Sequence, residues 1–90
     1  ESVVMVTISQ RERHRQLMVT IANNLRILRK SKGWTQHDLA KKSGVSRVSI
    51  ARFETASRMP DFDTMCSLAD ALGVSTEIFR ENLSEAASVA

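Results

Sequence analysis

The sequence predicts an all-α domain of five helices. Apolar residues recur at helical spacing in successive segments, and the 3 glycines and the 1 proline fall between those segments. Glycine is favoured directly after a helix and proline interrupts helices, so these residues mark where the predicted helices end and begin. The length of 90 residues and the hydrophobic fraction of 42% are typical of one globular domain.

The first predicted helix ends at about Lys32. Ile21, Leu25 and Leu28 lie three or four residues apart, as the buried face of a helix requires. Gly33 follows as the expected C-cap. This helix is therefore expected to supply one apolar face to the core.

Two short helices are predicted next. Thr35 is the expected N-cap of the second helix, and Asp38 completes a capping-box-like pair that also suits the positive end of the helix dipole. Gly44 ends this helix. Ser46 caps the third helix, which is expected to run to about Glu54.

The last two predicted helices follow the proline. Asp61 is the natural N-cap of the fourth helix, which carries an apolar stripe and ends at Gly73. Ser75 begins a short fifth helix that carries Ile78 and Phe79. The five helices together place the folded domain at residues 20–80.

Segments of different character flank this domain. Residues 1–19 are expected to form an N-terminal arm or extension. Within it, residues 3–8 are apolar and β-branched, which indicates a short strand or an arm, whereas residues 9–16 are typical of a polar, basic lead-in helix. Residues 81–90 are small and polar and are expected to form a flexible tail.

The net charge of +3 is unevenly distributed along the chain. Residues 26–58 carry a net charge of +7, whereas residues 61–90 carry −5. A basic segment beside an acidic one indicates a surface for a polyanion such as nucleic acid. The alternative is an ordinary charged face in contact with solvent.

Composition also bears on location and on chemistry. Cys66 is the only cysteine, which excludes an internal disulfide and fits a reducing compartment. No apolar run approaches the roughly 18 residues of a membrane span, and no signal-peptide pattern is present, so we expect a cytoplasmic protein with no membrane contact. His14 and His37 lack metal-ligand spacing. The sequence shows no glycine-rich phosphate-binding loop and no nucleophile, base and acid in an order typical of an enzyme. We therefore expect no enzyme, no metal and no cofactor.

Residues 36–55 have the pattern of a helix-turn-helix. Leu39 and Val45 flank the turn and are expected to seal its inner side. Ala40 is small, as the close crossing of the two helices requires. Gly44 can adopt a positive φ, which costs other residues about 1–2 kcal/mol.

The third helix has a buried face and an outward face. Ile50 and Phe53, three residues apart, supply the buried one. The residues left to point away from the core are Arg47, Val48, Ala51 and Arg52.

These residues closely resemble the helix-turn-helix family of phage Cro and repressor proteins. The resemblance covers about residues 21–79, including Trp34-Thr35-Gln36, Arg58-Met59-Pro60 and Leu72-Gly73-Val74-Ser75. It implies a five-helix bundle of the lambda-repressor-like type with the third helix in the major groove of DNA. Ser43 departs from the family, which usually has an apolar residue there, and so does Thr55-Ala56, where a basic residue or Asn and then Gly is usual.

The resemblance also implies which residues contact DNA. Arg47, Val48, Ala51 and Arg52 fall at its base-reading positions; arginine can bind guanine with two hydrogen bonds, and valine can contact a thymine methyl group. The expected phosphate contacts are Gln36, Ser46, Ser49, Lys41 and Arg58. Arg29 and Glu54 stand at positions that form a buried ion pair in several members, so we expect Arg29 to neutralise Glu54.

Taken together, these features predict a sequence-specific transcriptional regulator, such as a phage-type repressor or a restriction–modification controller protein. One helix reads only a few base pairs, so we expect a homodimer on a pseudo-palindromic operator with half-sites about 34 Å apart. The dimer surface is expected at Val74, Ile78 and Phe79, or at residues 3–8. The alternative is an antitoxin or another protein-interaction module that binds a protein partner and contacts DNA only secondarily.

Overall fold

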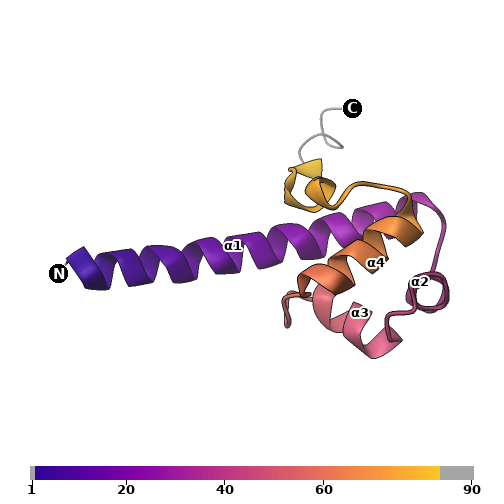
Figure 1. Cartoon of the computed structure of the whole chain (residues 1–90), viewed down its shortest axis with the longest axis horizontal. Helices are drawn as coiled ribbons and strands as arrows, with labels where there is room; N and C mark the ends of the chain where they lie inside the picture. The colour runs from indigo at the N-terminus through magenta and orange to yellow at the C-terminus, as the bar shows by residue number, and fades with distance from the viewer. Residues whose placement is uncertain (1, 84–90) are drawn as a thin grey trace.

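The computed structural model describes residues 2–83, with side chains described from residue 9 onward. Within this range the chain forms four α-helices and one 3₁₀ helix (Figure 1). They are α1 (Ser2–Ser31), α2 (Gln36–Ser43), α3 (Arg47–Glu54), α4 (Phe62–Leu72) and η1 (Thr76–Arg80). Residues 84–90, which make up most of the predicted tail, lie outside the described residues.

Helix α1 is one continuous helix of 30 residues, which corresponds to about 45 Å of length. Its C-terminal half contacts α3 and η1, whereas its N-terminal half projects beyond the other helices (Figure 1). The helix predicted at residues 9–16 is therefore confirmed, and of the two alternatives for residues 3–8 the strand is wrong, because these residues are helical. The β preference of valine is weak, and adding residues to an existing helix is easier than starting a separate strand. The domain boundary predicted at residue 20 falls inside α1.

The fifth predicted helix is a 3₁₀ helix. Ser75 begins it as predicted, since its side chain accepts a hydrogen bond from the N–H of Glu77. η1 has only 5 residues, which is enough for one turn, and short segments of this kind adopt the tighter 3₁₀ form. The prediction of five α-helices is corrected to four α-helices and this turn.

The core lies where α1, α2, α3, α4 and η1 meet. Leu25, Leu39, Ile50 and Leu68 are each at most 1% exposed, so every α-helix contributes at least one fully buried residue. Phe79 of η1 completes the core at 1% exposure. The helix-turn-helix is therefore packed against a scaffold made of α1, α4 and η1.

A buried amide attaches η1 to α1. The Nδ2 of Asn24 donates its two hydrogens to the carbonyl oxygens of Phe79 and Glu81, and the carbonyl oxygen of Ile78 lies 3.3 Å from the same nitrogen. Asn24 is 1% exposed, and no buried side-chain nitrogen or oxygen among the described residues lacks a partner. This single side chain therefore anchors the end of η1 to α1.

Candidate nucleic-acid interface

The capping box predicted for α2 is present. The Oγ1 of Thr35 accepts from the N–H of Asp38 at 3.0 Å, and the Oδ2 of Asp38 accepts from the N–H of Thr35 at 2.9 Å. Hydrogen bonds from Thr35 hold the pKa of Asp38 below its usual value of 3.8. The start of α2 is thereby fixed next to the link from α1.

The turn between α2 and α3 has the geometry that its sequence predicts. Gly44 ends α2 in the left-handed region at φ 77°, and Ser46 caps α3 by accepting from the N–H of Ser49. Ser43, which departs from the family pattern, accepts from the N–H of Val45 at 3.1 Å. This hydrogen bond gives the serine a role inside the turn in place of apolar packing.

Helix α3 presents the outward face expected from the sequence. Ile50 and Phe53 are buried, whereas Arg47 and Arg52 are exposed and Val48 is 63% exposed. An open hollow of about 550 Å³ covers this outward face, and its lining residues are Gln36, Arg47, Val48, Ala51, Arg52 and Thr55. The structure thus brings all four predicted base-reading residues onto one surface, together with the first residue of α2.

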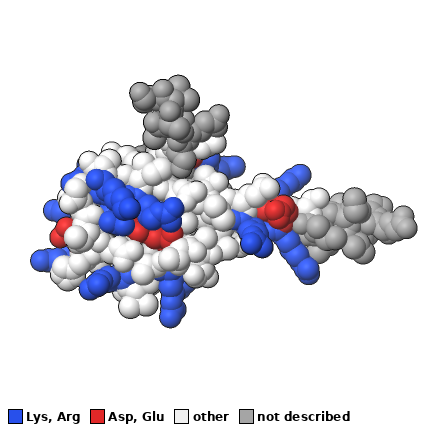
Figure 2. All heavy atoms as spheres, turned by 180° about the vertical axis from the view of Figure 1, so that it is seen from behind, with Lys and Arg blue, Asp and Glu red and all other residues white. Residues whose placement is uncertain are grey.

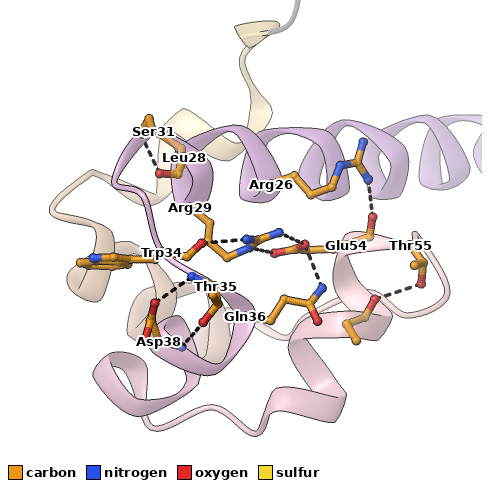
Figure 3. Close-up of polar contacts among 11 residues, drawn as sticks. Arg26, Leu28, Arg29, Ser31, Trp34, Thr35, Gln36, Asp38, Glu54 and Thr55 are labelled. Carbon is orange, nitrogen blue, oxygen red and sulfur yellow. Dashed lines mark hydrogen bonds and ion pairs between the residues drawn. The ribbon is translucent and has the colours of Figure 1, made fainter.

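Beneath this surface lies the predicted ion pair. The Nε of Arg29 donates to the Oε2 of Glu54 at 2.7 Å, and the Nη2 donates to the Oε1 at 2.8 Å, so the pair is held by two parallel hydrogen bonds (Figure 3). Arg29 is 8% exposed and Glu54 is 2% exposed. Hydrogen bonding to Glu54 raises the pKa of Arg29 above its usual value.

The same arginine also fixes the link between α1 and α2. Its Nη1 donates to the carbonyl oxygen of Trp34 at 2.8 Å (Figure 3). Arg26, one turn earlier on α1, donates to the backbone carbonyl of Glu54. The end of α3 is therefore attached to α1 through both the side chain and the backbone of Glu54.

Gln36 has a partner that the sequence did not indicate. Its Nε2 donates to the Oε1 of Glu54 at 3.1 Å (Figure 3). In this position Gln36 joins the start of α2 to the end of α3 and also borders the hollow on α3. Its predicted phosphate contact remains a prediction.

The other predicted phosphate contacts lie at separate places. The hydroxyl groups of Ser46 and Ser49 are hydrogen-bonded to each other at 2.9 Å at the start of α3. Lys41 is exposed in the last turn of α2. The exposed guanidinium of Arg58 lies over the Phe53 ring, 5.8 Å from its centroid.

The predicted dimer residues are unequally accessible. Val74 and Ile78 are half-buried, whereas Phe79 is 1% exposed and belongs to the core. Any contact with a second copy at this face therefore depends on Val74 and Ile78 more than on Phe79.

Two polar residues that organise this region were missed. Asn24 lies on the apolar face of α1, between Ile21 and Leu25, and a buried amide at such a position requires a partner. Arg26 stands three residues before Arg29, so the two cations follow one side of the helix. These patterns could have been recognised, but the carbonyl oxygens they bind could not.

Two kinds of feature are absent from the part of the chain that the structure describes. No helix there is both long and apolar enough to span a membrane. No three His, Cys, Asp or Glu side chains in the same part of the chain cluster as a metal site would require.

Several known proteins are similar to this chain in sequence. The chain is 36% identical over 56 residues to the uncharacterized HTH-type transcriptional regulator YqaE of Bacillus subtilis, a match that covers 62% of this chain and 48% of YqaE. It is 33% identical over 55 residues to antitoxin HipB of Escherichia coli, which covers 61% of this chain and 58% of HipB. The chain thus spans about half the length of the curated relatives it matches.

A solved structure adds a likeness in three dimensions. The restriction-modification controller protein C.Esp1396I, crystallised as a tetramer with its natural 35-base-pair operator, superposes with a TM-score of 0.67 at 32% identity. The superposition covers 77% of this chain and 91% of that protein. Residues 25–79, more than half of the chain, match the family described as Helix-turn-helix (HTH_3), and this chain belongs to that family.

Proposed function

We propose that this chain is a sequence-specific DNA-binding transcriptional regulator that places α3 in the major groove. The observation that carries the proposal is the outward face of α3, where Arg47, Val48, Ala51 and Arg52 share one open surface. The family assignment and the operator complex of C.Esp1396I support it. A protein with this task works in the cytoplasm, which the lone Cys66 also favours.

The chemistry of this face suits base edges. Arg47 and Arg52 are about one and a half turns apart, are exposed and line the same hollow, and a guanidinium group binds the O6 and N7 of guanine with two hydrogen bonds. Val48, at 63% exposure, offers methyl groups to thymine. Ala51 is small enough to allow a base pair to approach the helix closely.

The proposed regulator acts as a homodimer on a pseudo-palindromic operator. Helix α3 has only 8 residues, so one copy reads only a few base pairs. Two copies with half-sites about 34 Å apart would read enough sequence for tight specificity. Val74 and Ile78 offer an apolar surface for the contact between the two copies. The similar protein C.Esp1396I forms a tetramer in complex with its operator.

The test begins with selection of binding sites from random duplexes. Each of the variants Arg47→Ala and Arg52→Ala should reduce discrimination between the selected and a scrambled duplex by about 5- to 150-fold, because one bidentate contact contributes about 1–3 kcal/mol. Arg80→Ala removes an exposed cation from η1 and serves as the control. If both α3 variants bind the selected duplex as the wild type does, the proposal is wrong.

An antitoxin is the second candidate function. The 33% identity with HipB supports it. Such a protein would co-purify with a specific protein partner, and the isolated chain would bind no duplex tightly. Tight operator binding by the isolated chain would instead favour the regulator.

A further inference from the structure

We propose that the outward basic face of α1, formed by Arg11, His14 and Arg15, binds phosphates of the DNA strand that flanks the groove read by α3. The proposal rests on the proposed function. It assigns a binding role to residues outside the matched family segment 25–79.

A second hollow joins α1 to the end of α3. It has a volume of about 520 Å³, and its lining residues are His14, Arg15, Met18, Val19, Thr55 and Ala56. Thr55 also lines the hollow on the outward face of α3. The two hollows therefore meet at Thr55 and form one surface from the proposed base-reading residues to α1.

The position of α1 relative to α3 is fixed. Arg29 and Arg26 attach α1 to Glu54, the last residue of α3, immediately before Thr55. Helix α1 then continues past α3 and projects from the domain (Figure 1). Basic side chains stand out from this projecting part around one acidic group, next to the grey atoms in Figure 2. A duplex placed along α3 would thus meet these cations without any rearrangement of the domain.

Helical geometry defines which cations share this side of α1. Successive residues are about 100° apart around a helix, so Arg11 lies one turn before Arg15 and in line with the residues of the hollow. Arg13 is about 200° from Arg11 and points to the opposite side. Arg11, Arg13 and Arg15 are all exposed. The chain therefore contains a matched pair of test cations and a control on the same helix.

The hollow has the chemistry of a phosphate site. Arginine binds phosphate with charge-assisted and often paired hydrogen bonds. None of the six described residues that line the hollow carries a carboxylate, and the nearby Glu54 is neutralised by Arg29. Thr55 and Ala56 are small, so a DNA strand can approach. Arg11 and Arg15 are about 6 Å apart along the helix, which lets each contact its own phosphate.

The experiment compares Arg11→Ala, Arg15→Ala and the double variant with Arg13→Ala, which removes the same charge from the other side. Affinity for the selected and for a scrambled duplex is measured over a range of salt concentrations. Because the proposed dimer carries two copies of each arginine, each single variant should weaken binding to both duplexes alike and reduce the log–log salt slope by about 1.8, and the double variant by about 3.6. Arg13→Ala should keep the wild-type slope.

Several outcomes would overturn the inference. An unchanged slope in the double variant would do so, and so would an equal loss in Arg13→Ala, which would indicate only diffuse attraction. If sedimentation shows that the double variant changes the oligomeric state, the face is a subunit contact instead. If Arg47→Ala loses discrimination while the α1 variants bind normally, this inference fails and the proposed function stands. If the wild type binds no duplex, the proposed function itself fails.

Discussion

The two halves of α1 belong to one helix but differ in what stabilises them. In the C-terminal half, Ile21, Asn24, Leu25 and Arg29 are buried against α3, η1 and the core. In the N-terminal half, residues 9–16 are all exposed. Tertiary contacts hold the C-terminal half, whereas the described side chains of the N-terminal half, those of residues 9–16, bury little surface. Regular backbone geometry therefore says little about how much each part of a helix contributes to the stability of the domain.

The arginines show the same contrast. Arg29 lies in the buried half and is neutralised by Glu54, so its charge serves the fold. Arg11 and Arg15 lie in the exposed half, so their charges are available to a partner. A cation on a helix can be interpreted only after its carboxylate partners have been located.

The largest expected effect comes from breaking the ion pair in the buried half. Glu54→Ala should lower the free energy of unfolding by about 3–5 kcal/mol, because it leaves the Arg29 guanidinium buried without its counter-charge. Urea unfolding followed by circular dichroism measures the loss. The double variant Arg29→Met/Glu54→Leu should lose much less, because no charge is left unpaired. A loss below about 1 kcal/mol for Glu54→Ala would contradict the importance of the pair.

A smaller effect is expected at the amide that holds η1. Asn24→Ala should cost about 1–3 kcal/mol, because it removes the donor from buried carbonyl oxygens. Hydrogen exchange at residues 76–80 should speed up more than in α2. The isosteric variant Asn24→Asp should be at least as unstable, because it also lacks the NH₂ group. Unchanged exchange in both variants would show that packing of Phe79 alone holds η1.

Acid should weaken the start of α4. Hydrogen bonds from Thr64 hold the pKa of Asp61 below its usual value of 3.8. A carboxyl group whose pKa is lowered by folding stabilises the protein above its unfolded pKa, and this contribution is lost as the pH falls through the folded pKa. The Asp61→Asn variant keeps a good N-cap but does not titrate, so it should lose less stability than the wild type between about pH 5 and pH 2. Equal losses would show that Asp61 contributes nothing to the acid sensitivity.

The smallest effect on global stability is expected in the exposed half of α1. Glu12→Pro should disrupt the helix before residue 12, which lowers the helical circular dichroism signal. The free energy of unfolding measured with urea should nevertheless change by less than about 0.5 kcal/mol, because no buried contact is lost. Ile27→Pro, in the half that packs against the domain, is the contrasting variant and should lower the free energy of unfolding by about 3 kcal/mol. A large loss in Glu12→Pro would show that the exposed half is coupled to the core.

Local sequence signals predicted most of the fold. Thr35, Ser46 and Asp61 are N-caps and Gly44 is a C-cap in the structure, because capping depends on residues close together in the chain. The apolar spacing likewise identified the core residues of each helix. The strand predicted at residues 3–8 is wrong because β preference is context-dependent and the neighbouring residues continue the helix.

The site was predictable where the resemblance supplied positions and less so where contacts are long-range. The sequence pattern and the resemblance predicted the outward residues of α3 and the pair Arg29–Glu54. The hydrogen bond from Gln36 to Glu54 and the role of Asn24 were not, because their partners are 18 and more than 50 residues away. The hollow shared by α1 and Thr55 was missed because it depends on the direction in which α1 leaves the domain.

The ion pair under α3 has a consequence for the evolution of binding specificity. The groups that hold α3 in place, Arg29 and Glu54, face inward, whereas Arg47, Val48 and Arg52 face outward. Substitutions at exposed positions usually change stability by less than about 0.5 kcal/mol. With the proposed function, a lineage of such proteins can therefore acquire new target sequences by exchanging outward side chains, while the inherited scaffold that orients them stays intact.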